Sequence, residues 1–118
     1  MVGKMKIKQV EIIKSVLETM LDTKGIVGYK IARNLRMINE ELIEYENVKR
    51  ELFRKYGREE NNQLIIDRDS ENYPLFLGEL KPYQEQEVEF DFKKITEEEL
   101  AESGLSANQM MFLMEYFE

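Results

Sequence analysis

The sequence predicts an α+β fold: a helical hairpin with one long helix, packed on a small two- or three-stranded sheet and followed by two short C-terminal helices. Three patterns support this fold class. Between residues 28 and 56, apolar residues recur every three or four positions, which is the period of an amphipathic helix. Two segments alternate between charged and apolar residues, as half-buried strands do. Two capping-box sequences near the C-terminus predict the starts of two further helices.

The long helix is predicted over Gly28–Tyr56, which corresponds to roughly 40 Å at 1.5 Å per residue. Gly57 follows it, where a glycine in the left-handed conformation often ends a helix. Basic side chains in the last turns are favourable to the helix dipole. The buried stripe of this helix is formed by apolar residues at a four-three spacing: Ile31, Leu35, Ile38, Leu42, Tyr45, Leu52 and Tyr56.

A shorter helix is predicted over Gln9–Asp22, with Gly25 as the residue that ends it. Because the connection to the long helix is short, the two helices should fold back on each other as a hairpin. The shorter helix covers only part of the longer one, so the stripe between Leu42 and Tyr56 needs another cover. Two alternatives follow: the C-terminal helix covers it, or it is a site for a partner or for a second copy of the chain.

Two strands are predicted over Lys4–Lys8 and Glu87–Phe92. The outward face of the first is basic and that of the second is acidic. Because opposite charges on paired strands are stabilising, we expect the two strands to be neighbours in one sheet. Their apolar faces should then pack against the helical hairpin.

The middle of the chain is predicted to be less regular. Arg58–Asn62 has the composition of a polar turn, and Gln63–Asp67 is a short β-branched run that predicts a strand. Leu75–Leu80 predicts one short helix, which Pro82 should stop.

The C-terminal helices are predicted from their caps. Thr96–Glu99 and Ser106–Gln109 each place a hydroxyl residue three positions before Glu or Gln, as a capping box requires. The first of these helices is expected over Glu97–Glu102, and Ser103 and Gly104 should end it. The last helix is apolar on nearly every side.

Composition excludes most kinds of enzymatic site. The chain has no cysteine and no histidine, and it contains no nucleophile elbow or glycine-rich phosphate loop. We therefore expect no enzyme activity, no catalytic residue, no cofactor and no metal. The acidic stretch Asp67–Glu71 has the spacing of a calcium loop, but Asn72 and Gly78 stand where such a loop needs glycine and glutamate.

The length of 118 residues predicts a single domain, residues 1–118, with one modest core. No run of about 18 apolar residues is present, so we expect no membrane span. No apolar segment follows the N-terminal lysines, so we expect no signal peptide and a cytoplasmic location.

Charge is distributed unevenly along the chain. Residues 1–58 hold 13 basic and 8 acidic side chains, a net charge of +5, whereas residues 59–118 hold 4 and 16, a net charge of −12. Two interpretations stay open: an acidic surface that imitates nucleic-acid phosphates, or an ordinary solvated face that complements the basic strand. The candidate partner-binding carboxylates are Glu87, Glu89, Asp91, Glu97, Glu98, Glu99 and Glu102.

The last helix supplies a second candidate surface, because methionine-rich faces adapt to many partners. Met110, Met111 and Met114 are the candidate contact residues there. The last two helices have the outline of a helix-turn-helix, but the second carries no lysine or arginine. We therefore expect no direct binding of nucleic acid.

The order of these pieces resembles a group of small proteins of unknown function, encoded by tailed phages and prophages of low-GC Gram-positive bacteria. The resemblance rests on the lysine-rich first strand, the helix that ends in Arg54–Gly57, the acidic strand Glu87–Phe92, and the pair Leu105 and Ser106 that opens the final helix. The group has no catalytic residues to transfer to this chain.

The resemblance implies two roles for a small acidic phage protein in the host cytoplasm. One is inhibition of a host defence complex, as anti-CRISPR proteins do, with a CRISPR effector or another nucleic-acid-binding protein as partner. The other is an assembly or chaperone role that uses the long helix and the methionine-rich helix. The acidic second half of the chain favours the first role, and a homodimer is open in either case.

Overall fold

The computed structural model describes residues 2–118 and confirms the α+β class. Within these residues there are six helices and two antiparallel two-stranded sheets, and 62% of the chain is helical. The elements, in chain order, are β1 (Val2–Lys6), α1 (Ile7–Glu18), α2 (Gly25–Glu41), α3 (Ile43–Tyr56), β2 (Arg58–Glu60), β3 (Gln63–Ile65), α4 (Asn72–Gln84), β4 (Glu87–Asp91), α5 (Glu97–Ala101) and α6 (Ala107–Phe117).

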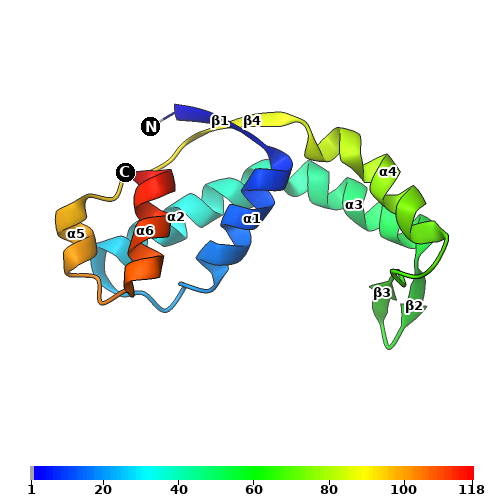
Figure 1. Ribbon diagram of the computed structural model, residues 1–118, viewed down its shortest axis with the longest axis horizontal. Helices are drawn as coiled ribbons and strands as arrows, with labels where there is room; N and C mark the ends of the chain where they lie inside the picture. Colours follow the sequence, from blue (N-terminus) through cyan, green and yellow to red (C-terminus); the bar gives the residue numbers. More distant parts are fainter. Residues whose placement is uncertain (1) are drawn as a thin grey trace.

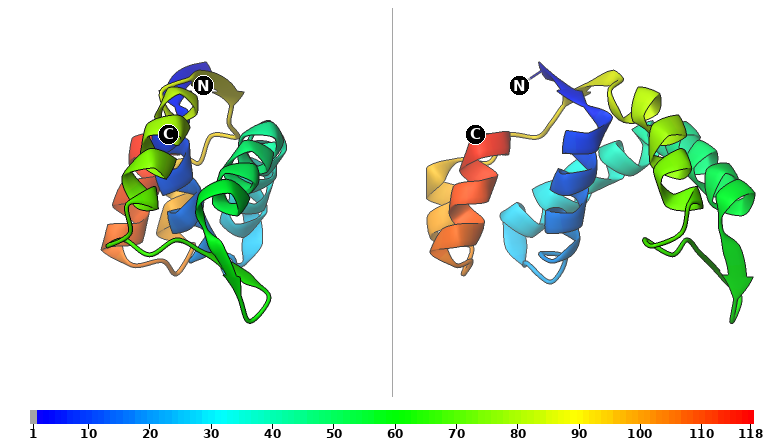
Figure 2. Two further views of the ribbon diagram at one scale, coloured as in Figure 1. Left: turned by 90° about the vertical axis from the view of Figure 1, so that its right-hand side faces the viewer. Right: turned by 45° about the vertical axis from the view of Figure 1, so that its right-hand side comes forward.

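The molecule is elongated and has two parts that we name the body and the arm (Figure 1). The body consists of α1, α2, α5, α6 and the β1–β4 sheet. The arm consists of α3 and α4, which lie side by side, with the β2–β3 hairpin at its tip (Figures 1 and 2). The principal extents are 50 × 30 × 21 Å. Most fully buried side chains belong to the body, among them Val10, Leu17, Ile31, Ile38 and Leu113.

The predicted pairing of the basic and acidic strands is confirmed. In the antiparallel β1–β4 sheet, Lys4 lies opposite Glu89 and Lys6 lies opposite Glu87. The first strand has the predicted length but lies two residues earlier, over Val2–Lys6 instead of Lys4–Lys8, because α1 begins at Ile7 and includes Lys8. Ile7 fits the helical spacing of the buried residues of α1, so the helix begins at this residue.

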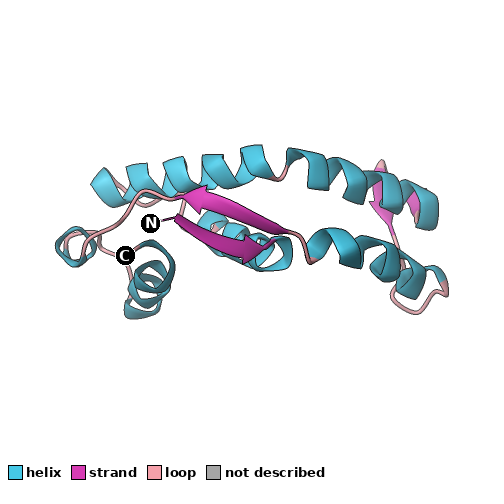
Figure 3. Cartoon of the chain, turned by 90° about the horizontal axis from the view of Figure 1, so that it is seen from above, coloured by secondary structure: helices cyan, strands magenta, loops and turns pink. Residues whose placement is uncertain are grey.

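The predicted long helix is divided, and one uninterrupted helix over residues 28–56 is wrong. α2 begins at Gly25 and α3 ends at Tyr56, with a break at Leu42, where ψ is 3° (Figure 3). Hydrogen bonds still cross the break, from the Leu42 N–H to the Ile38 carbonyl and from the Glu46 N–H to the Leu42 carbonyl. Leu42 is fully buried where the body and the arm meet. The break therefore changes the direction of the chain without leaving the core.

Two glycines have roles other than those predicted. α1 ends at Glu18 rather than Asp22, and Gly25, with φ at +73°, is the first residue of α2 rather than the end of α1. Gly57 is extended, with φ at −98° and ψ at −174°, so the predicted left-handed cap is wrong. An added Cβ at Gly57 would lie 2.6 Å from the Phe53 carbonyl oxygen and 2.7 Å from that of Ile65. Close backbone approach, not a left-handed conformation, excludes a side chain there.

The predicted polar turn over residues 58–62 is in fact the first half of a β-hairpin. β2 and β3 pair antiparallel, and the two residues between them, Asn61 and Asn62, have φ values of 53° and 65°. Two positive φ values in a two-residue loop are characteristic of a type I′ turn, which matches the twist of paired strands. This hairpin is a separate sheet from β1–β4.

α4 is longer than the predicted Leu75–Leu80 helix, and Pro82 lies inside it rather than stopping it. α4, not α6, covers α3: the rings of Phe53 and Phe76 meet edge to face at 4.7 Å. The expectation that the last helix covers the stripe beyond Leu42 is therefore wrong.

α6 packs on the body instead, at the other end of the molecule from the arm (Figure 1). The Phe117 ring meets that of Phe92 at 4.9 Å, and the Phe117 carbonyl accepts a 2.7 Å hydrogen bond from the Ile95 N–H. Both predicted capping boxes are confirmed, at Thr96 and at Ser106.

Candidate interaction surfaces

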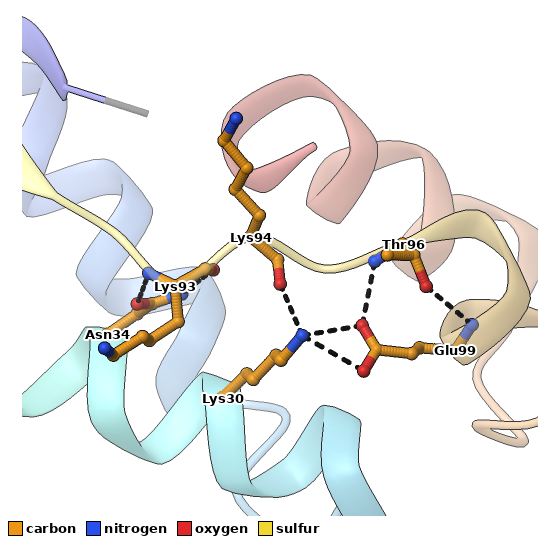
Figure 4. Close-up of polar contacts among 6 residues, drawn as sticks. All are labelled: Lys30, Asn34, Lys93, Lys94, Thr96 and Glu99. Atoms are coloured by element: carbon orange, nitrogen blue, oxygen red, sulfur yellow. Dashed lines mark hydrogen bonds and ion pairs between the residues drawn. The ribbon is translucent and has the colours of Figure 1, made fainter.

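A polar clamp fixes the segment between β4 and α5 onto α2 (Figure 4). The fully buried side-chain amide of Asn34 donates to the Lys93 carbonyl at 3.0 Å and accepts from the Lys93 N–H at 2.7 Å. One turn earlier, the Lys30 amine donates to the Lys94 carbonyl at 2.6 Å and to the Glu99 carboxylate at 2.7 Å. The clamp thereby sets the position of α5, which carries several of the candidate carboxylates.

The α5 carboxylates differ in their surroundings. Glu99 is half-buried, and hydrogen bonding from Lys30, then from the Thr96 backbone, lowers its pKa. Glu97, Glu98 and Glu102 are exposed, and none of them forms an ion pair with the part of the chain that the structure describes. We name these three residues the α5 acidic cluster. Glu98 and Glu102 also line a shallow hollow against the first turn of α2.

The outer face of β4 is exposed but is not a free row of carboxylates. Glu89 forms an ion pair with Lys4 at 3.7 Å, and Glu87 faces Lys6 across the sheet. Asp91, the third candidate, lies opposite Val2 in the register. The predicted surface of seven carboxylates is therefore divided into a strand face shared with lysines, a clamped Glu99, and the α5 acidic cluster.

Much of the charge asymmetry along the sequence is used inside the fold. Basic residues of the first half pair with acidic residues of the second half, often across more than 60 positions. Glu85, at the end of α4, accepts from Lys6 at 2.7 Å and from Lys8 at 3.0 Å, and these bonds lower its pKa to about 2. Further pairs of this kind are Lys4–Glu89, Lys30–Glu99, Lys55–Glu79, Arg58–Glu60 and Arg58–Asp67.

The methionine-rich helix presents only part of its apolar surface. Met110 and Met114 are half-buried against the core, whereas Met111 is 63% exposed. The rings of Phe112 and Tyr116 pack on each other at 5.0 Å. A partner would therefore meet Met111 first, because the other two methionines are half-buried.

An open groove between α3 and α4 was not predicted from the sequence. Its volume is about 730 Å³, and its lining combines apolar side chains with carboxylates. Four of its nine lining residues belong to α4, whose extent the sequence did not predict. One feature of the sequence does point to the groove. Gly78 and Pro82 are poor helix formers, and both lie on the face of α4 that lines it.

Among residues 2–118, acidic residues do not gather in threes in a way that could hold a metal ion. None of the helices described is both long enough and apolar enough to cross a bilayer.

Comparison of this chain with known proteins finds no relative. No family model matches this chain. No curated protein and no solved structure is significantly similar to it either. Function must therefore be argued from the surfaces themselves.

Proposed function

We propose that this chain is a non-enzymatic protein-binding protein of phage or prophage origin, acting in the bacterial cytoplasm. Its proposed partner is a host nucleic-acid-handling defence complex, which it inhibits in the manner of an anti-CRISPR protein. The contact is made by the α5 acidic cluster, with the outer face of β4 beside it. The origin and the class of partner rest on the resemblance described above.

The observation that carries this proposal is the α5 acidic cluster. Glu97, Glu98 and Glu102 are exposed and are held on a segment that the Asn34 and Lys30 clamp fixes in place. Carboxylates on a rigid support present a defined negative surface, which steers association with a basic groove. The strand face contributes less, because lysines share it.

A phage assembly or chaperone role is the second candidate. The exposed Met111 and the open groove on the arm favour it, since both offer apolar surface to a partner. The two roles differ in salt dependence: an electrostatic contact weakens as salt rises, whereas an apolar contact does not.

The test is inhibition of DNA cleavage by purified RNA-guided CRISPR effector complexes of low-GC Gram-positive bacteria. We expect the wild-type protein to inhibit at least one effector and to lose affinity for it by about tenfold or more between about 50 and 300 mM salt. The variant E97Q/E98Q/E102Q should lose inhibition.

The matched control is E59Q/D69N/E71Q, which removes three exposed carboxylates near the tip of the arm. It has the same net charge as the α5 variant and should inhibit like the wild type. Equal effects of the two variants would mean that net charge, and not the α5 acidic cluster, carries the binding. Absence of inhibition across the panel would contradict the inhibitor role.

A further inference from the structure

The arm is only two helices thick, and one of its faces is an open apolar groove. α3 and α4 lie side by side (Figures 1 and 3). The rings of Phe53 and Phe76 meet between them. Beside this contact, Val48 and Leu52 of α3 are half-buried and Tyr83 of α4 is 43% exposed, and all three line the groove. A pair of helices cannot bury both of its faces, so this face stays unfilled within the chain.

The floor of the groove is open at Gly78. A Cβ added there would meet nothing within 4 Å, so neither packing nor backbone conformation requires glycine at this position. Glycine in the middle of a helix is nevertheless less favourable than alanine. The missing side chain leaves room that a side chain from another molecule can occupy.

Pro82 leaves a backbone carbonyl of a lining residue without its helical donor. Proline has no N–H, so the Gly78 carbonyl does not receive the helical bond that residue 82 would otherwise donate. Gly78 and Pro82 both line the groove. A donor on an incoming molecule can satisfy that carbonyl.

The rim of the groove is acidic. Glu44 and Glu51 of α3 and Glu79 of α4 line it, and none of the nine lining residues is basic. Glu51 pairs with Arg54, and Glu79 pairs with Lys55 at 3.1 Å, but both pairs are exposed. Exposed ion pairs contribute little, so a cation from a partner can share these carboxylates at small cost.

We propose that this groove binds one positively charged amphipathic helix of another protein. The apolar face of that helix lies on Val48, Leu52 and Tyr83, with one side chain over Gly78. Its lysines or arginines meet the carboxylates of the rim. The lining repeats every three or four residues along both α3 and α4, which is how a groove accepts anchors at positions i, i+3 or i+4, and i+7.

The charge of the rim argues against a second copy of the chain as the occupant. A symmetric dimer through this face would bring the two sets of three carboxylates together, and juxtaposed like charges are unfavourable. A basic helix has the opposite charge and covers the apolar floor as well.

The experiment uses the full chain and a fluorescent designed peptide as long as α3, helical, with leucines at i, i+3, i+4 and i+7 and lysines on either side. Fluorescence anisotropy should show saturable one-to-one binding. Gly78→Leu fills the floor with a better helix former, so the protein should stay folded and bind about tenfold more weakly or worse. Ala101→Leu, which adds bulk on exposed α5, should bind like the wild type.

Charge is tested with a second matched pair. E44Q/E51Q/E79Q should weaken peptide binding, whereas E97Q/E98Q/E102Q, with the same net charge, should not. Equal weakening by both variants, or equal binding of a peptide with glutamates in place of lysines, would overturn the proposal. So would a dimer of the free protein that Gly78→Leu dissociates, because a second copy would then be the occupant.

This inference does not rest on the proposed function, because the arm and the α5 acidic cluster lie at opposite ends of the molecule (Figure 1). The two proposals can therefore be contradicted independently of each other, each by its own set of variants. E97Q/E98Q/E102Q tests the first surface and leaves the groove intact.

Discussion

Asn34 shows how one polar side chain can hold two distant parts of the chain together. It is fully buried on α2, among apolar neighbours, and its amide satisfies both the N–H and the carbonyl of Lys93. No buried polar side-chain atom among the described residues lacks a hydrogen-bond partner. Asn34 therefore acts as a specific connector, because its amide offers a donor and an acceptor on two neighbouring atoms.

Asn34→Ala should lower the free energy of unfolding by about 2–3 kcal/mol, because both Lys93 backbone groups lose their partner and a cavity is left. Urea denaturation followed by circular dichroism measures the change. Asn39→Ala, on the exposed side of the same helix, should change stability by less than about 0.5 kcal/mol. Similar values for the two variants would show that the clamp does not stabilise the fold.

At the level of elements, the hairpin at the tip of the arm depends on its two turn residues. Asn61 and Asn62 both have positive φ, which asparagine tolerates better than most residues and β-branched residues tolerate poorly. β2 and β3 have three residues each, so few other contacts hold them in register. The turn therefore decides whether the hairpin forms.

Asn62→Gly should preserve the hairpin, since Asn-Gly is a favoured type I′ pair. Asn62→Val should disfavour it by about 1–2 kcal/mol, the usual cost of the left-handed conformation. NMR cross-strand contacts between Glu59 and Leu64 report the population directly. Undiminished contacts in the valine variant would contradict the turn assignment.

At the scale of the whole molecule, stability depends on the contacts that hold the arm on the body. The radius of gyration is 16.9 Å, against about 13.5 Å for a compact chain of this length. Polar contacts join the parts at two places, between α3 and α1 and between the end of α4 and the start of α1. At the first place, Lys49 of α3 also pairs with Glu11 at 3.0 Å. The Tyr45 hydroxyl of α3 donates to Glu11 of α1 at 2.7 Å, and burial, followed by this bond, raises the pKa of Tyr45. Glu85, after α4, accepts from Lys6 and Lys8.

Acid should weaken this attachment. The pKa of Glu85 is about 2 in the folded protein and near 4.5 when unfolded, so its stabilising effect is complete above about pH 4.5. It is lost as pH falls towards 2, where the folded carboxylate takes up a proton. We expect the free energy of unfolding to fall over this range, and Glu85→Gln to flatten the fall.

Urea denaturation at a series of pH values measures this dependence. Glu18→Gln, at an exposed position at the end of α1, is the control and should leave the slope unchanged. An identical pH dependence in wild type and Glu85→Gln would mean that the contacts with Lys6 and Lys8 do not stabilise the fold.

Features set by short stretches of sequence were predicted well. Both capping boxes depend on residues three positions apart, and the pairing of β1 with β4 depends on alternation and opposite charge within two short segments. The candidate carboxylates could be listed in the same way. Which of them stay free could not, because Lys30 reaches Glu99 only after α2 and α5 meet.

The fold class, the helix caps and the pairing of β1 with β4 can thus be predicted from residue order alone, because local spacing and charge encode them. Packing in the folded molecule sets the break at Leu42, the extent of α4 through Pro82, and the close backbone approach at Gly57. Packing also places α4 rather than α6 on α3, and so sets where the groove lies. These features depend on contacts between segments far apart in the chain, whose packing no local pattern records.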